Sequence, residues 1–326
     1  CTSSLFLESS TGMTRLHFVS VEIHPFDRQD MQRLKGSLPP SLHPMADELL
    51  AAYPLLVRGL HRLVLAGGRV HLSLYFGDVL QGLQALSFRA DAWFLDGFAP
   101  AVNPAMWGET LCAAIAAHSR SGTTLATFTA AGSVRRALTE AGFHVTRSKG
   151  FGRKRHMTQA VFTSTASDGN RLPIGTFSLQ GGMESTDPPS SRQRIIIIGS
   201  GLAGACMAFN ARQLGAELLV LEAEPDVACG GSGNAQGALY IKPGLEWSAH
   251  TRLQVAAALH ARQFYASVPE LAASCWKECG LLVQISDARE ETRQARLNEL
   301  NDYPPEFFHS LTRDQASSRA EVALAR

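Results

Sequence analysis

The stretch that decides the fold of the second half of the chain is RIIIIGSGLAG, residues 194–204. Four consecutive isoleucines predict a parallel strand that is buried on both faces. Glycines at the spacing GxGxxG follow the isoleucines directly, and a second apolar run, residues 217–221, ends at Glu222. An acid at about 20 residues beyond such glycines is typical of a βαβ unit that binds a dinucleotide.

Each part of this pattern has a physical task. Gly199 permits the tight turn, Gly201 lets the backbone approach a pyrophosphate, and Gly204 lets the helix pack closely on the strand. The start of the helix offers free N–H groups to the phosphates, and Glu222 would accept hydrogen bonds from a ribose. A glycine-rich turn without a ligand is the alternative. The predicted dinucleotide contacts are Gly199, Ser200, Gly201, Leu202, Ala203, Gly204 and Glu222.

A second glycine-rich loop, GGSGNAQG at residues 230–237, favours FAD over NAD. Glycines let the backbone come close to a large planar ligand, and flavoproteins of the D-amino-acid-oxidase type have such a loop near the flavin ring. A loop without a ligand is the alternative. The predicted flavin contacts in this loop are Ser232, Gly233, Asn234 and Gln236.

The N-terminal half alternates strand-like and helix-like segments, which predicts an α/β fold around a mostly parallel sheet. We expect strands at residues 16–21, 70–76, 92–95, 123–128, 143–147 and 158–162, and helices at 45–56, 104–118 and 131–141. The last two strands have no helix between them, so an antiparallel pair is expected there. In the second half we expect helices at 202–214 and 248–265.

Three acids stand at the ends of successive predicted strands: Glu22, Asp78 and Asp96. The carboxyl ends of parallel strands meet at the edge where open α/β folds bind ligands. In a class I (Rossmann-like) S-adenosylmethionine (SAM) methyltransferase, these acids would hold the ribose, hold the adenine amino group and lie near the methyl donor. Each could instead be a solvated loop residue or a helix N-cap.

Composition bounds the remaining possibilities. The chain has 326 residues and a net charge of +1, which predicts about two domains and disfavours a globally basic nucleic-acid binder. The stretch 164–193 is rich in Ser, Gly, Pro and Thr and is interpreted as a linker between domains 1–163 and 194–326.

Six scattered cysteines fit neither a disulfide framework nor a zinc site, so we expect no metal and a reducing, cytoplasmic compartment. No apolar run is long enough to span a bilayer, so no membrane partner is expected.

A local basic run remains as a candidate nucleic-acid contact. Its predicted phosphate contacts are Lys149, Arg153, Lys154 and Arg155. A run of charges that simply faces solvent is the alternative.

The sequence DAWFLDGFAP at residues 91–100, followed by Asn103-Pro104 and Met106-Trp107, closely resembles the MnmC family of bifunctional tRNA 5-methylaminomethyl-2-thiouridine biosynthesis proteins. Further matches are HFVSVE at 17–22, ATFTAAG at 126–132, GFGRKR at 150–155 and SGNAQGALY at 232–240. The resemblance implies a class I SAM methyltransferase domain, followed by a FAD-binding domain of the D-amino-acid-oxidase type.

The family's activity is a two-step modification of the wobble uridine in the tRNA anticodon loop. The flavin half removes the carboxymethyl group from 5-carboxymethylaminomethyl-2-thiouridine, and the methyltransferase half then methylates the resulting amine. The resemblance makes Asp96 the candidate catalytic residue, which would position the amine or accept its proton. Phe98, Trp107 and Phe151 are candidates for stacking on the uridine, although core packing is the alternative for Trp107.

The sequence departs from the family at both ends. The family's SAM-binding glycine loop precedes the segment matching 16–22, but residues 1–15 contain no GxG. We therefore expect an internal fragment that lacks the first strand and glycine loop of the methyltransferase and the later part of the flavin domain, and that is inactive in both reactions. Two other functions stay open: a flavin-dependent oxidase of small amines or amino acids fused to a methyltransferase remnant, and a non-enzymatic tRNA-binding module.

Overall fold

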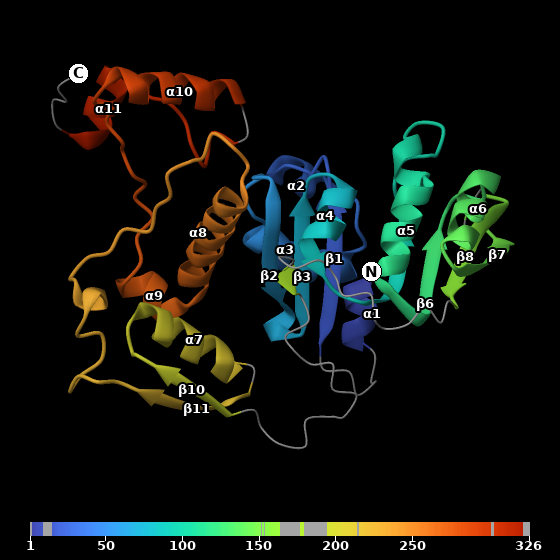
Figure 1. Cartoon of the computed structure of the whole chain (residues 1–326), viewed down its shortest axis with the longest axis horizontal. Helices are drawn as coiled ribbons and strands as arrows, with labels where there is room; N and C mark the ends of the chain where they lie inside the picture. Colours follow the sequence, from blue (N-terminus) through green and yellow to red (C-terminus); the bar gives the residue numbers. More distant parts are fainter. Residues whose placement is uncertain are drawn as a thin grey trace. The chain divides into compact units, whose positions relative to one another are not determined.

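The computed structural model describes residues 2–8, 15–150, 152, 154–163, 177–178, 194–213, 215–300 and 303–321 (Figure 1). These residues belong to two compact units, one comprising Cys1–Leu179 with Ile241–Arg326 and the other comprising Gln180–Tyr240. Of the stretch interpreted as a linker, only β9 (Phe177–Ser178) is described, and it pairs in parallel with β4 (Leu86–Ser87).

The first sheet has the order β1-β3-β2 (Figure 1). Its strands are β1 (Leu16–Glu22), β2 (Gly59–Leu65) and β3 (Val70–Phe76). The predictions for β1 and β3 are confirmed, and the two strands run parallel. Strand β2 was not predicted from the sequence. It forms an antiparallel hairpin with β3 across Gly67 and Gly68, both at positive φ. Strand β2 alternates buried and exposed residues, so one face of the sheet packs into a core.

This first core contains Leu63 and Leu65 of β2 beside Tyr53 and Phe76, with Leu49 of the neighbouring helix against them. The elements at this end of the chain are α1 (Thr2–Glu8), α2 (Arg28–Gly36), η1 (Pro40–Leu42), α3 (His43–Ala52) and η2 (Ala66–Gly68).

The second sheet has the order β5-β6-β8-β7. Its strands are β5 (Ala90–Leu95), β6 (Ser119–Thr127), β7 (Phe143–Lys149) and β8 (His156–Phe162). The expected antiparallel pair is confirmed, because β7 pairs with β8 along its whole length. Only β5 and β6 run parallel, and β8 is antiparallel to β6, so the described strands of this half are mixed rather than mostly parallel. Strands β1 and β5 each pair with a single neighbour within the described residues.

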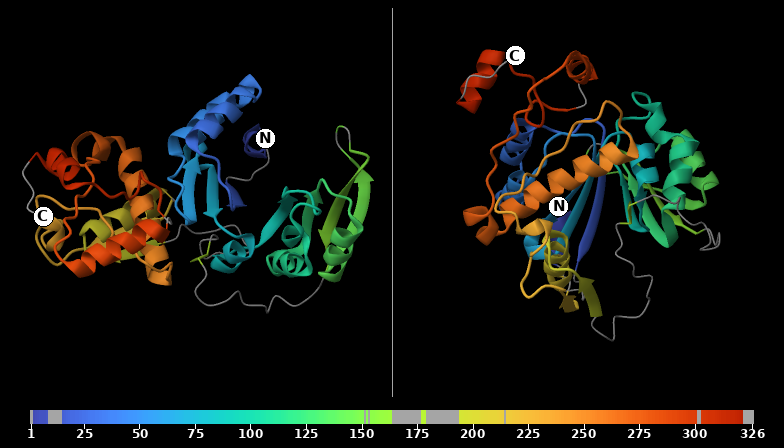
Figure 2. Two further views of the ribbon diagram at one scale, coloured as in Figure 1. Left: turned by 90° about the horizontal axis from the view of Figure 1, so that it is seen from above. Right: turned by 60° about the vertical axis from the view of Figure 1, so that its left-hand side comes forward.

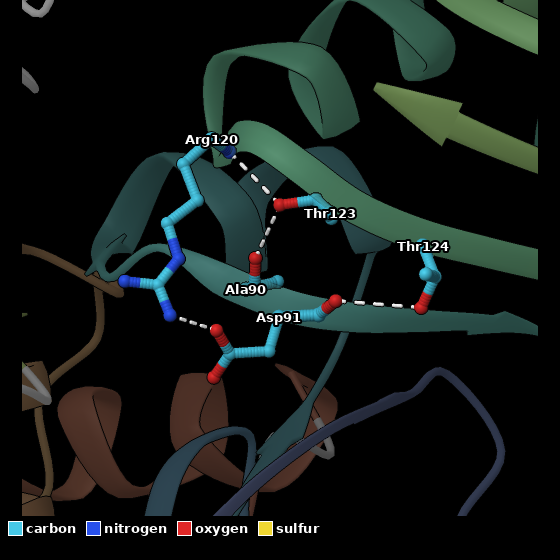
Figure 3. Close-up of polar contacts among 5 residues, drawn as sticks. All are labelled: Ala90, Asp91, Arg120, Thr123 and Thr124. Atoms are coloured by element: carbon cyan, nitrogen blue, oxygen red, sulfur yellow. Dashed lines mark hydrogen bonds and ion pairs between the residues drawn. The ribbon is translucent and has the colours of Figure 1, made fainter. Parts of the chain in front are cut away.

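Polar contacts hold the amino end of β5 against β6 (Figure 3). The hydroxyl of Thr123 donates to the carbonyl oxygen of Ala90 at 2.6 Å and accepts from the backbone N–H of Arg120 at 2.9 Å. The Arg120 guanidinium pairs with the carboxylate of Asp91, whose carbonyl accepts from the Thr124 hydroxyl at 3.4 Å. These contacts lie at the opposite end of β5 from Asp96.

The helices beside this sheet are α4 (Val79–Ala85), α5 (Glu109–Ala117) and α6 (Gly132–Glu140). Helices α5 and α6 pack against each other and against the strands (Figure 2). Ile115, Leu138 and Phe143 are almost completely buried in the shared core. The single helix expected over 104–118 is broken at Gly108, whose extended backbone separates η3 (Pro104–Trp107) from α5.

The second unit is a βαβ arrangement, with β10 (Arg194–Ile198) parallel to β11 (Glu217–Leu221) and α7 (Leu202–Gln213) between them (Figure 1). The predicted strand–helix–strand order is confirmed. The expectation that the isoleucine strand is buried on both faces is wrong for the described residues. Ile197 is buried, but Ile198 is 87% exposed, because α7 packs on one face only.

The remaining elements are η4 (Gly231–Gly233), α8 (Ala249–Ser267), α9 (Pro269–Ser274), α10 (Ala288–Leu300) and α11 (Arg313–Ala320). The Ser248 hydroxyl caps α8 by accepting from the backbone N–H of Thr251 at 3.2 Å. Val255 and Leu259 of α8 pack with Val57, which precedes β2, and with Leu297 of α10. No helix in the described ranges is long and apolar enough to cross a membrane.

Candidate active sites

The three predicted acids lie at the carboxyl ends of their strands. Glu22 ends β1, Asp78 follows β3, and Asp96 follows β5. The backbone N–H of Gly77 donates to the Glu22 carbonyl at 2.9 Å, which joins the first two strand ends. Desolvation raises the pKa of Glu22 above its ordinary value and the negative charge of Asp96 adds to this rise, while the Ser20 hydroxyl at 3.2 Å opposes it. The structure thus brings Glu22 close to Asp96 and to the strand end that Asp78 follows.

Asp78 also has a structural task. Its Oδ1 accepts from the backbone N–H groups of Leu80 at 3.0 Å and Gln81 at 3.1 Å, so Asp78 is the N-cap of α4. Both bonds go to one oxygen. A carboxylate can therefore serve as an N-cap and still offer its second oxygen to a ligand.

The loop after Asp96 is held in place by the buried side chain of Trp107. Trp107 is only 5% exposed, and its indole N–H donates to the carbonyl of Phe98 at 2.7 Å. Gly97 lies so close to Met106 that a Cβ at this position would lie 3.1 Å from its side chain. Phe98 itself is 69% exposed, so it offers a ring face to a ligand while Trp107 packs in the core.

Lys149, Lys154 and Arg155 of the basic run lie at the turn of the β7–β8 hairpin. Lys149 pairs with His156 in the ladder, and the backbone N–H of Gly150 donates to the carbonyl of Arg155 at 3.2 Å. Lys149, Lys154 and Arg155 are exposed. Because β8 runs antiparallel to β6, this turn lies at the carboxyl end of β6, on the same edge as Asp96. Phe151 and Arg153 lie outside the described residues.

Phe128 directly follows β6 at this edge, and it was not among the site residues predicted from the sequence. The Lys154 Nζ lies 3.7 Å from the centroid of its ring. The position of Phe128 directly after a parallel strand could have identified it, because ligand-binding residues gather at the ends of such strands.

The glycine loop of the second unit has the geometry that a dinucleotide needs. Gly199 has φ +93° and its backbone N–H donates to the Leu221 carbonyl at 2.7 Å, which closes the turn between the strands. A Cβ on Gly204 would collide with the carbonyl oxygen of Gly199, so only glycine permits this approach of helix and strand.

The carboxylate of Glu222 is hydrogen-bonded to this loop. Its Oε2 accepts from the backbone N–H of Ser200 at 2.7 Å and from the Ser200 hydroxyl at 2.5 Å. Its Oε1 accepts from the backbone N–H groups of Ala223 at 2.9 Å and Glu224 at 3.2 Å. These bonds, above all those from Ser200, lower the pKa of Glu222 to about 2.

The second glycine-rich loop lies against the first. The Ser232 hydroxyl accepts from the backbone N–H of Leu202, at the start of α7, at 3.0 Å. A Cβ on Gly201 would lie 2.8 Å from this hydroxyl oxygen. Ser232 therefore marks an acceptor position at the helix N-terminus, where a phosphate oxygen would bind. The side-chain amide of Asn234 donates to the carbonyl of Gly231 at 3.0 Å and shapes the loop.

The two remaining predicted dinucleotide contacts also lie nearby. Ala203 is in the first turn of α7, and Gln236 lies exposed in the loop after η4. Within the described ranges, no group of three or more His, Cys, Asp or Glu side chains is arranged to hold a metal ion.

Two family models match the chain. Residues 40–163 match an S-adenosyl-L-methionine-dependent methyltransferase family, and residues 194–325 match a FAD dependent oxidoreductase family. A solved structure, that of MNMC2 from Aquifex aeolicus, is 25% identical, matches over 46% of this chain and 45% of its own, and has a TM-score of 0.37.

Curated relatives match almost the whole chain. The tRNA 5-methylaminomethyl-2-thiouridine biosynthesis bifunctional protein MnmC of Hahella chejuensis is 41% identical over 98% of this chain and 48% of its own length. The proteins of the same name from Marinobacter nauticus and Stutzerimonas stutzeri are each 42% identical, over 95% and 99% of this chain and 46% and 47% of their own lengths. The chain belongs to the MnmC family, and it spans about half the length of the curated relatives it matches.

Proposed function

We propose that the chain contributes to a two-step modification of the tRNA wobble uridine. A FAD-dependent step removes the carboxymethyl group from 5-carboxymethylaminomethyl-2-thiouridine, and a SAM-dependent step methylates the 5-aminomethyl group that remains. In this proposal residues 1–163 are the methyltransferase domain, 164–193 the linker and 194–326 the oxidoreductase domain. The observation that carries it is the gathering of three carboxylates and a basic hairpin at one edge, together with the names of the matching relatives.

In the methylation step, the protein has to present a neutral amine to an electrophilic methyl group. The amine is protonated in water, so it must lose a proton before it can attack. Asp96 stands at the strand end where its carboxylate can accept a hydrogen bond from the amine and take this proton. Alignment of the nitrogen with the methyl carbon and the sulfur supplies much of the rate.

Glu22 and Asp78 are the residues that would hold SAM, through its ribose hydroxyls and its adenine amino group. SAM supplies a methyl group bound to a positively charged sulfur. The rise in the pKa of Glu22 follows from desolvation and from Asp96, and a positively charged ligand at this edge would offset that mutual repulsion.

In the oxidation step, the glycine loop and Glu222 would hold the adenosine and pyrophosphate of FAD, and the loop around Ser232 would lie toward the flavin. FAD supplies a hydride acceptor when it is bound. The protein's part is to orient the carbon next to the substrate amine toward the flavin, after which water hydrolyses the resulting imine of the substrate.

The basic hairpin would hold phosphates of the anticodon loop through Lys149, Lys154 and Arg155, and Phe98 would stack on the uridine. Phe151 and Arg153 stay as predicted substrate contacts, whereas the stacking role predicted for Trp107 is wrong, because its ring is buried in the core. A tRNA substrate also supports a location in the cytoplasm.

The test uses the gene in its own genome and mass spectrometry of the wobble nucleoside. We expect Asp96→Ala to accumulate 5-aminomethyl-2-thiouridine, because oxidation continues while methylation stops. Glu222→Gln should accumulate the carboxymethyl form instead. Asp30→Ala, at a surface position of helix α2, is the matched control and should give the fully modified nucleoside.

Unchanged nucleosides in both site variants would refute the proposal. If the purified protein then oxidised free glycine or sarcosine but left tRNA unchanged, the small-amine oxidase would be the better assignment.

A further inference from the structure

The aromatic ring of Phe128 makes a cation–π contact with a lysine side chain. The Lys154 ammonium lies 3.7 Å from the ring centroid, well inside the roughly 6 Å over which an aromatic face attracts a positive charge. Lys154 comes from the β7–β8 turn and Phe128 from the end of β6, so the contact joins two separate segments at the carboxyl edge.

The ring of Phe128 also contacts the core. Trp107 meets Phe128 edge-on, with a centroid distance of 5.9 Å and an interplanar angle of 84°. Trp107 is buried and is itself fixed by its bond to the Phe98 carbonyl. The backbone beyond Phe128 is fixed as well, because the Thr158 hydroxyl donates to the Thr129 carbonyl at 2.7 Å. The orientation of the aromatic face is therefore set before any ligand arrives.

The ladder of β5 and β6 places this face beside the predicted catalytic carboxylate. Leu95 pairs with Thr127, and Asp96 and Phe128 are the next residues of the two parallel strands. A carboxylate and the face of an aromatic ring thus occupy equivalent positions at neighbouring strand ends. Both groups favour a positive charge between them.

Such a charge arises in the proposed methyl transfer. The nitrogen lone pair forms the new N–C bond, the C–S bond breaks with its electron pair going to sulfur, and the nitrogen becomes positively charged until it loses a proton to a base. An interaction that is stronger with the charged nitrogen than with the neutral amine lowers the barrier.

We propose that the face of Phe128 is the binding surface for the 5-aminomethyl group of the substrate, and that the Lys154 ammonium competes for this face. The inference rests on the proposed methyl transfer and adds a residue to it. When RNA phosphates draw Lys154 away, the face becomes available to the substrate amine.

The experiment measures two dissociation constants for the protein purified from its own gene. One probe is an anticodon stem-loop RNA with 5-aminomethyl-2-thiouridine at the wobble position, and the other is the same RNA with its amine acetylated. Their ratio cancels the phosphate contacts, which both RNAs share. We expect wild-type protein to prefer the charged amine, and Phe128→Leu to reduce this preference about 3- to 30-fold.

Three further variants sharpen the result. Phe128→Tyr keeps an aromatic face and should keep the preference, while Lys154→Gln removes the competing ammonium and should increase it. Phe209→Leu, on α7, is the matched control and should leave the ratio unchanged. A melting curve for each variant verifies that it is folded.

The outcomes separate this inference from the proposed function. If the wild-type protein prefers the charged amine and Phe128→Leu keeps that preference in full, the assignment of Phe128 is wrong and the proposed function stands. If the wild-type protein shows no preference between the two RNAs, the proposal of an amine site at this edge fails as well.

Discussion

Ser200 donates two hydrogen bonds to the same carboxylate oxygen of Glu222, from its backbone N–H at 2.7 Å and from its hydroxyl at 2.5 Å. The acid of the dinucleotide fingerprint is therefore bound to the middle of its own glycine loop. This contact fixes the spacing between β10 and the end of β11, where a ribose and a pyrophosphate would lie side by side.

The first prediction concerns the charge of Glu222. Its pKa is lowered to about 2, so the ionised form stabilises the folded state above the ordinary value of 4.5, and this stabilisation is lost as the pH falls from 4.5 toward 2. We expect Glu222→Gln to abolish this part of the pH dependence and to reduce the FAD content of the purified protein severalfold. Flavin absorbance and acid titration of the fold measure the two effects. Glu217→Gln, at the start of β11, is the control, and an equal loss of FAD there would contradict the assignment.

The second prediction concerns Gly204. A Cβ at this position would collide with the carbonyl oxygen of Gly199. This oxygen belongs to the backbone, so it cannot move away without opening the turn. We expect Gly204→Ala to prevent FAD binding and to lower the melting temperature. Gly36→Ala, at the end of α2, is a matched control, because a Cβ there meets nothing within 4 Å. Normal flavin content in Gly204→Ala would show that the loop does not bind the cofactor in this geometry.

The third prediction concerns acid sensitivity at His118. The ring is 4% exposed, and its nitrogens lie 2.9 Å from the Leu83 carbonyl and 3.2 Å from the Phe88 carbonyl. Burial lowers the pKa of His118 below its ordinary 6.5, against the opposing effect of the two carbonyls. The unfolded chain therefore binds a proton at a higher pH than the folded chain does, and stability decreases as the pH falls below about 6.5.

Urea unfolding at a series of pH values measures this contribution. His118→Gln should give a flatter dependence of the unfolding free energy on pH than wild type between pH 7 and 5. His24→Gln, at an exposed position after β1, should keep the wild-type slope. Identical slopes for wild type and His118→Gln would exclude His118 as the source.

The fourth prediction concerns Trp107. Trp107→Phe keeps an aromatic edge near Phe128 but leaves the Phe98 carbonyl without its indole donor. A typical intramolecular hydrogen bond contributes about 0.5–1.5 kcal/mol to stability. We expect a decrease of this size in unfolding free energy together with a weaker methylation of the wobble nucleoside and an unchanged flavin content. Full methylation in this variant would mean that the loop after Asp96 needs no anchor.

Local patterns predicted the βαβ unit and the bounds of β3 well, because strand, glycine turn and acid lie close together in the sequence. The missed strand β2 did carry a signal in the sequence: residues 59–65 contain three leucines and a valine and are followed by Gly67 and Gly68. The isoleucine strand was predicted to be buried on both faces because a continuous apolar run is typical of such strands. One face of the strand is exposed because a helix packs on the other face only. This packing is part of the tertiary structure and cannot be predicted from the composition of the strand.

The candidate site was predictable where it depends on strand ends. Glu22, Asp78 and Asp96 each follow an apolar run, and parallel strands bring such ends together. The contact of Lys154 with Phe128 was not predictable, because it depends on how the β7–β8 hairpin pairs with β6.

The measurement that tests the central claim most directly is mass spectrometry of the wobble nucleoside in tRNA from cells that carry Asp96→Ala at the gene's own locus. We predict that 5-aminomethyl-2-thiouridine accumulates at the expense of the methylated nucleoside, while the carboxymethyl precursor stays at its wild-type level. A normal amount of 5-methylaminomethyl-2-thiouridine in these cells would contradict it.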